Sequence, residues 1–185
     1  MVEISRRTFV MLSGTTLGLA ACGNGLGGNG AARLDARVDA TRAYLLQNFP
    51  GTQDLMSRAA GVLYMPLMTE AGFGIGGAYG RGALRINDVT VDYYSATQAS
   101  IGLTLGAQQY AHALFFMTSE ALENFRRQNG WQAGAGVTYA LPDGGGTAGI
   151  DTTTTTAPVI ALVFGQAGFI AGATLDGTKY TRIIP

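Results

Sequence analysis

Glycine recurs at every second position in a long stretch of this chain, and this repeat constrains the fold more than any other feature. Residues 71–82 read "AGFGIGGAYGRG", with glycine or alanine at every even position. Successive side chains of a β-strand point to opposite faces, so a period of two predicts a strand with one face nearly bare. The larger side chains of this stretch and its continuation are Phe73, Ile75, Tyr79, Arg81 and Arg85.

Other segments share the period of two. Residues 101–106 and 131–141 repeat the bare-faced pattern, which permits tight curvature and the close approach of a second backbone. Pro66 is expected at a bend or an edge, because proline cannot donate to a β-ladder. A turn is expected at Asn87-Asp88. The remaining predicted strands are 61–68, 89–93, 113–117, the hairpin arms 159–164 and 169–175, and 179–184.

Helical spacing is confined to three segments. Residues 34–49 form an amphipathic pattern that Pro50 ends, and Thr52 can cap a short second helix. A third helix begins at Thr118 or Ser119 and stops near residue 130. These elements predict an α+β protein, mainly β, in which a strongly curved antiparallel or barrel-like sheet carries two or three packed helices.

Gly72, Gly74 and Gly77 match the G-x-G-x-x-G spacing of a dinucleotide-binding loop. Such a loop needs a helix directly after it, whose N-terminus meets the pyrophosphate. The segment that follows here keeps the strand period and contains Gly80 and Gly82. We therefore expect these glycines to lie in a strand, and we expect no nucleotide partner.

The N-terminus has the features of an export signal. Arg6 and Arg7 precede a weakly apolar segment that is too short to span a membrane. The arginine pair resembles a twin-arginine signal, although such pairs also occur in general secretory signals. Next comes "LAAC", which ends at Cys22 and resembles the lipoprotein box, where cleavage precedes a cysteine that becomes acylated. Cys22 is the chain's single cysteine, so it cannot form an internal disulfide.

These features predict the domain organisation. Residues 1–21 form a cleaved signal peptide, residues 22–32 a lipidated cysteine with a glycine-rich tether, and residues 33–185 one domain. Gly23 follows the cysteine where enteric bacteria place Asp to retain a lipoprotein in the inner membrane. We therefore expect a lipid anchor in the outer membrane of a bacterial envelope.

Composition and motifs exclude several classes of function. Only 13% of the residues are charged and the net charge is zero, so no basic surface predicts nucleic-acid binding. His112 is the chain's single histidine and lies in an apolar strand, where a packed role is more usual than a catalytic one. No nucleophile elbow and no cluster of metal ligands is present. We expect no catalysis, no metal and no cofactor.

Arg81 and Arg85 share one face of the predicted strand, near Tyr79. Guanidinium groups bind phosphates well, so these three residues are candidates for contact with lipid headgroups. The alternative is that both arginines are solvated or pair with nearby acids.

Four long segments resemble the SYLF domain, a lipid-binding and actin-binding family. They read "AAGVLYMPLMTEAGFGIGGAYGRGAL", "YYSATQASIGLTLGAQQYAHALFFMTSEALENF", "GWQAGAGVTYAL" and "FGQAGFIAGATLDGTKYTRI", within residues 59–183. The resemblance implies lipid binding. Eukaryotic relatives bind phosphoinositide membranes, partly through an N-terminal amphipathic helix, and bacterial relatives are commonly lipoproteins. The family supplies no catalytic residues.

Together these expectations describe a non-catalytic lipoprotein whose SYLF-like domain binds membrane phospholipid at the envelope. The alternative is a scaffold that is anchored only through Cys22 and binds an envelope protein partner.

Overall fold

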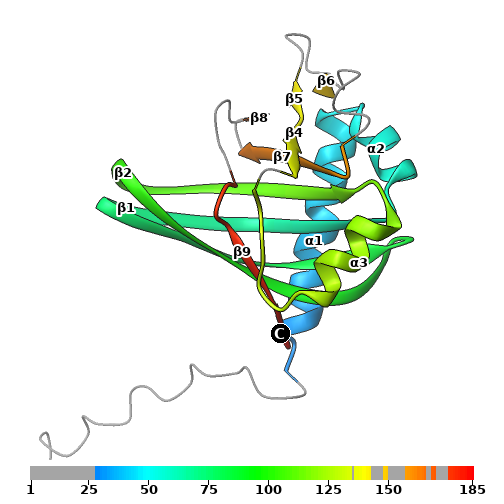
Figure 1. Cartoon of the computed structure of the whole chain (residues 1–185), viewed down its shortest axis with the longest axis horizontal. Helices are drawn as coiled ribbons and strands as arrows, with labels where there is room; N and C mark the ends of the chain where they lie inside the picture. The colour runs from blue at the N-terminus through cyan, green and yellow to red at the C-terminus, as the bar shows by residue number, and fades with distance from the viewer. Residues whose placement is uncertain (1–27, 135, 143–147, 150–156, 166–167, 170–174) are drawn as a thin grey trace, which may run out of the picture.

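The computed structural model describes residues 28–134, 136–142, 148–149, 157–165, 168–169 and 175–185. Figure 1 shows a strongly curled sheet with helices packed against it. The helices are α1 (Gly30–Asn48), α2 (Thr52–Arg58) and α3 (Ser119–Arg127). The strands are β1 (Gly61–Ile86), β2 (Val89–Phe116), β3 (Trp131–Gln132), β4 (Val137–Tyr139), β5 (Leu141–Pro142), β6 (Ala148–Gly149), β7 (Val159–Gly165), β8 (Gly168–Phe169) and β9 (Lys179–Ile183). The predicted α+β class, mainly β, is confirmed.

Two very long strands form the centre of the fold. β1 has 26 residues and β2 has 28, and they pair antiparallel along almost their whole length. Asn87 and Asp88 connect them with φ angles of 50° and 64°, and positive φ at both positions is what a type I′ hairpin turn requires. The turn was predicted, but the division of each arm into shorter strands is wrong. The glycine-rich stretches continue the ladder instead of interrupting it.

β2 organises the rest of the sheet, because it has partners on both edges. One edge pairs with β1, and the other pairs with β9 near the start of β2 and with β7 near its end. In Figure 1 the β1–β2 hairpin folds back on itself, so that β7 and β9 join different layers of the fold. β4 pairs with β7 in parallel, which makes the predicted antiparallel sheet mixed at this edge.

Pro66 lies at an irregularity of the β1–β2 ladder. The register shifts between Met65 and Met68, and β1 has one residue more than β2 in this interval. A bulge leaves a residue out of the ladder, so proline's missing N–H is tolerated there. The predicted bend or edge at Pro66 is confirmed as a bulge, and Leu67 beside it is 38% exposed.

The bare glycine face lies against another part of the same strand. A Cβ atom at Gly80 would be 2.4 Å from the carbonyl oxygen of Leu67, and one at Gly82 would be 2.0 Å from that of Tyr64. No side chain fits at such distances. β1 therefore folds back over its own first half, and the glycines allow the two backbones to approach. The G-x-G-x-x-G spacing lies inside this continuous strand, so the strand–loop–helix geometry of a dinucleotide site does not form there.

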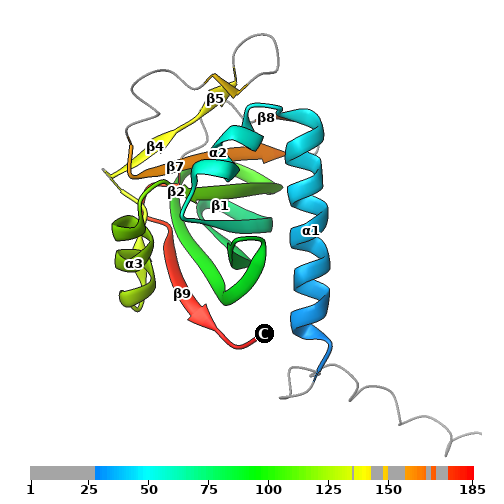
Figure 2. The ribbon, with the colours of Figure 1, turned by 90° about the vertical axis from the view of Figure 1, so that its right-hand side faces the viewer.

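The helices cover the curled sheet from two sides (Figure 2). Between the layers, Leu122 and Phe125 of α3 pack in one hydrophobic cluster with residues such as Phe116 and Tyr180. On the outer face, Val38 and Leu45 of α1 join a second cluster with α2 and β7. The apolar side of α1 is thus used for packing on the sheet, as the helical pattern of residues 34–49 predicted.

The third helix begins as predicted. The Thr118 side chain accepts a hydrogen bond from the Ala121 N–H, which satisfies one free donor of the first turn of α3. By contrast, the single strand predicted for residues 131–141 is wrong. β3 pairs with β9, β4 pairs with β7 and β5 pairs with β6, so the chain crosses between sheet edges within this segment. Residues 170–174, predicted as part of a hairpin arm, lie outside the described residues.

The predicted export and anchor residues also lie outside the described residues. These are Arg6, Arg7 and Cys22. α1 begins at Gly30, so the last residues of the tether predicted at 22–32 are helical. The folded domain therefore begins slightly before residue 33.

Candidate functional site

A cleft of about 570 Å³ lies beside the N-terminal half of α1. α1 contributes Arg33 and Arg37, which are four residues apart and therefore lie on one side of the helix. β1 contributes Tyr79 and Arg81, which are two residues apart and therefore lie on one face of the strand. We call this site the arginine cleft.

The three arginines of the cleft have no partner among the described residues. Within the part of the chain that the structure describes, none of them forms an ion pair or a side-chain hydrogen bond, although seven ion pairs form elsewhere. All three are exposed, and Tyr79 is 53% exposed. No Asp or Glu is among the described residues that line the cleft. Three positively charged side chains therefore line one cleft without an acidic side chain among its described lining residues, which also include Pro185.

The N-terminus of α1 adds to this positive potential. Asn29 and Gly30 line the cleft, and Asn29 makes no side-chain capping hydrogen bond. The first turn contains no acidic residue. A helix of 19 residues carries a partial positive charge at this end, where its first N–H groups lack intrahelical acceptors.

The acids of α1 point away from the cleft. Thr90 and Tyr93 donate hydrogen bonds of 2.8 Å to the two carboxylate oxygens of Asp35. Burial and this bond raise the pKa of Tyr93 to about 12. Asp39 Oδ1 lies 2.7 Å from Arg85 Nη1. Both carboxylates are therefore satisfied by the β1–β2 hairpin, on a different side of α1 from the arginines.

The predicted lipid-contact residues separate into two groups. Tyr79 and Arg81 lie together in the cleft, as their spacing suggested. Arg85 is 12% exposed and bound by Asp39, with Asp35 at 4.0 Å, which fits the alternative that it pairs with nearby acids.

Sequence reasoning missed Arg33 and Arg37 as site residues, although a signal for them exists. Two residues along a helix correspond to about 200° of rotation. The pair at positions 33 and 37 therefore faces away from the acids at positions 35 and 39. Which of these two stripes faces the Tyr79–Arg81 segment depends on how α1 docks, and helical spacing alone does not determine this.

A second basic cluster differs in its charge balance. Arg126 and Arg182 line another cleft near the end of α3, but both pair with Asp92, at 2.9 Å and 3.4 Å. Arg127 of the same cleft lies 3.6 Å from Glu123. These three arginines have two acidic partners, so this cluster is a weaker anion site than the arginine cleft.

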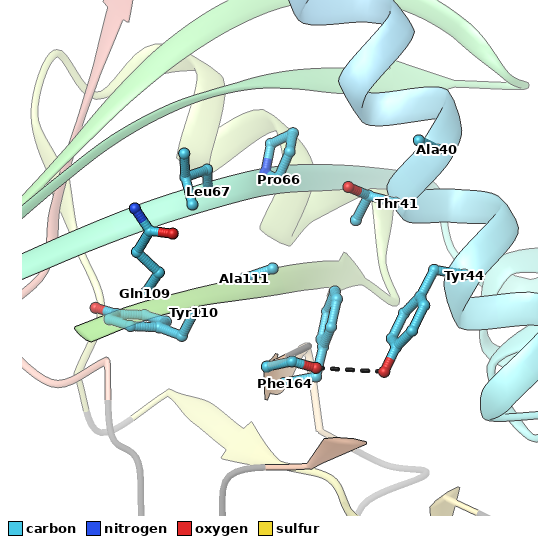
Figure 3. Close-up of a pocket in the computed structure, with 10 residues that line it drawn as sticks. Ala40, Thr41, Tyr44, Pro66, Leu67, Gln109, Tyr110, Ala111 and Phe164 are labelled. Carbon is cyan, nitrogen blue, oxygen red and sulfur yellow. Dashed lines mark hydrogen bonds between the residues drawn. The ribbon is translucent and has the colours of Figure 1, made fainter. Parts of the chain in front are cut away.

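An apolar pocket of about 210 Å³ lies further along α1 (Figure 3). Tyr44 and Phe164 stack on one side of it, with ring centroids 5.8 Å apart and planes 19° apart. The Tyr44 hydroxyl donates to the carbonyl oxygen of Gly165 at 3.3 Å. Pro66 and Leu67 of the β1 bulge line both this pocket and the arginine cleft.

His112 is part of the core. Its Nε2 lies 2.8 Å from the hydroxyl of Tyr180, and both side chains are fully buried. Burial lowers the pKa of His112 to about 3, so the ring is neutral at physiological pH. The rings of Tyr110 and Tyr180 lie beside it, at 6.2 Å and 5.8 Å between centroids. The expected packed role of this histidine is therefore confirmed.

The described residues contain no group of three or more His, Cys, Asp or Glu side chains arranged to hold a metal ion. None of the described helices has the length and apolar character needed to cross a membrane.

Comparison with known families gives a match over part of the chain. Residues 97–182 match the model of the Ysc84 family, which is described as "Las17-binding protein actin regulator". This match supports the SYLF domain over the segment from β2 to β9. No curated protein matches the chain.

Proposed function

We propose that this protein is a membrane-anchored lipoprotein of the bacterial envelope whose domain binds phospholipid headgroups through the arginine cleft, without catalysis. The convergence of the unpaired Arg33, Arg37 and Arg81 carries this proposal. The Ysc84 match supports a binding role, because that family is a lipid- and actin-binding domain family.

A phosphate is the anion that this cleft fits best. Arginine presents a planar fork of N–H donors that matches phosphate oxygens, and the N-terminus of α1 supplies further donors. Tyr79 places an aromatic ring with a polar tip at the edge of the cleft, as tyrosines do at membrane interfaces.

The predicted anchor would hold the cleft at a membrane. Gly28 lines the cleft, and Cys22 precedes it by six residues, a span of about 20 Å when extended. An acylated Cys22 would therefore keep the cleft close to the headgroups and raise their effective concentration. The apolar side of α1 is buried, so membrane contact through this helix is polar and does not require insertion.

Vesicle co-sedimentation tests the proposal with the full chain carrying Cys22→Ser, so that no acyl anchor contributes. Arg33→Gln with Arg37→Gln should weaken binding to phosphatidylglycerol-containing vesicles about 30-fold, since each basic residue near an anionic surface contributes about 1 kcal/mol. The matched control is Arg58→Gln with Arg127→Gln, which removes two exposed arginines outside the cleft. Equal binding of both double variants would contradict the proposed site.

The description of the Ysc84 family favours a second candidate function, because it names binding to another protein. In this alternative the protein is an envelope scaffold, and only the acylated cysteine contacts lipid. Crosslinking in cells that traps one protein partner, together with unchanged vesicle binding by the arginine variants, would favour the scaffold.

A further inference from the structure

The arginine cleft and the apolar pocket adjoin each other between α1 and β1, because they share two lining residues, and we call the two together the groove. Arg37 lines the cleft, and Ala40 and Tyr44 line the pocket. A spacing of three to four residues places these side chains on one side of α1. Pro66 and Leu67 line both spaces from the opposite wall. The groove therefore changes along α1 from a positively charged end to an apolar end.

We propose that the apolar pocket takes an acyl chain of the phospholipid whose phosphate lies in the arginine cleft, so that the domain holds one lipid molecule. This inference rests on the proposed function and extends it from surface contact to recognition of a single amphiphile.

The pocket's three side-chain hydroxyl groups already have partners, whereas Gln109, which also lines it, is exposed. The Tyr44 hydroxyl donates to Gly165, and Thr41 Oγ1 donates to the carbonyl oxygen of Arg37 at 2.9 Å. The Tyr110 hydroxyl donates to Gln98 at 3.3 Å. The space between them is therefore suited to a group that needs no hydrogen bonds.

Volume limits what this space can hold. About 210 Å³ is below the 300–1,000 Å³ typical of pockets for complete small-molecule ligands. Figure 3 shows the pocket between α1 on one side and β1 and β2 on the other. Its size suits the part of one chain nearest the headgroup, while the remainder of the lipid stays in the membrane.

Charge complementarity favours a phospholipid over a protein side chain as the occupant. A leucine or phenylalanine from a partner could fill the pocket, but it would bring no anion to Arg33, Arg37 and Arg81. A phospholipid carries a phosphate and an apolar chain in one molecule, in the same order as the two parts of the groove.

Calorimetric titration of the full chain carrying Cys22→Ser tests this inference. The probes are glycerophosphoglycerol, which has no chain, and dihexanoyl- and dioctanoyl-phosphatidylglycerol, each kept below its micelle concentration. Each methylene that enters the pocket should tighten binding about fourfold. The heat-capacity change should also become more negative as the chain lengthens.

Two pocket variants identify where the chain binds. Ala40→Phe fills the pocket from α1, and Gln109→Phe fills it from β2; both positions are exposed. Each should abolish the dependence on chain length and keep the affinity for glycerophosphoglycerol. Ala36→Phe is the matched control, because Ala36 is an exposed α1 residue outside both spaces and should change neither quantity. Thermal unfolding establishes that each variant is folded.

The outcomes separate this inference from the proposed function. Chain-length dependence that both pocket variants abolish and Ala36→Phe retains supports an acyl site. Equal affinity for all three probes, or dependence that survives both pocket variants, overturns the acyl site but leaves headgroup binding intact. No binding of any probe or of vesicles overturns the proposed function as well. Equally tight binding of octanoate would replace the phospholipid by a free fatty acid.

Discussion

Acid should destabilise this fold through His112. The ring is fully buried, Nε2 contacts Tyr180, and Nδ1 has no partner in the described structure. Burial lowers the pKa from the usual 6.5 to about 3 in the folded state. Between these values the unfolded chain binds a proton that the folded chain excludes, so stability is complete above about pH 6.5 and falls as the pH drops toward 3.

The size of the stability loss follows from the interval between the unfolded and folded pKa values of His112. Each pH unit within it removes about 1.4 kcal/mol, so lowering the pH from 8 to 4.5 should cost about 3 kcal/mol from this one group. Chemical denaturation of the full chain at both pH values measures the loss. Carboxylates also titrate in this range, so the wild-type loss alone does not isolate the histidine.

Two variants isolate the contribution of His112 to the pH dependence of stability. His112→Gln cannot titrate and should reduce the loss between pH 8 and 4.5 by about 3 kcal/mol, because the carboxylates contribute equally in both proteins. Tyr180→Phe removes the hydroxyl that contacts Nε2 and should lower stability at every pH by about 1–3 kcal/mol, while the pH dependence persists, since burial is its cause. The same pH dependence in His112→Gln as in the wild type would refute this reasoning.

Three further predictions concern the strand crossing and the N-terminus. Gly82→Ala should destabilise the fold by about 3 kcal/mol or more in denaturant titration, because the new Cβ would lie 2.0 Å from a backbone oxygen, whereas Gly136→Ala, with nothing within 4 Å, should stay within about 1 kcal/mol. Cys22→Ser should abolish labelling by a palmitate analogue, and unchanged labelling would rule out the lipoprotein box. Replacing Arg6 and Arg7 by Lys should block export if the route is twin-arginine; normal export would indicate the general secretory route.

Local patterns predicted elements more reliably than their connections. Some features depend only on residues close together in the sequence, so the local pattern is enough to predict them. These are the helix at residues 34–49, the cap at Thr118 and the turn at Asn87-Asp88. The continuity of β1 and β2 depends on pairing between distant segments. For example, Gly72 pairs with Gly106 across the hairpin. A glycine-rich stretch is compatible with a break or with a continuous strand, and only the partner strand decides between them.

The candidate site also has one part that the sequence predicts and one part that it does not. The proximity of Tyr79 and Arg81 was predictable, because side chains two residues apart in a strand point to the same face of the sheet. Their proximity to Arg33 and Arg37 was not predictable, because it depends on how α1 docks onto β1. Arg85 shares their strand face in sequence, but the curvature of β1 brings it to the acids of α1 instead. The alternation of side chains along β1 predicts which residues share a face of the strand. The bending of β1 determines which other residues each of them contacts.

The glycine face and the proposed site have a common structural origin. Gly80 lies in the arginine cleft between Tyr79 and Arg81, and its missing side chain lets the Leu67 backbone approach. Leu67 and Pro66 in turn form the boundary that the cleft shares with the apolar pocket. A side chain at position 80 would collide with the Leu67 backbone and displace this shared wall from the second half of β1. The glycine repeat thus permits the strand to cross itself, and the crossing creates the wall on which the proposed lipid site is built.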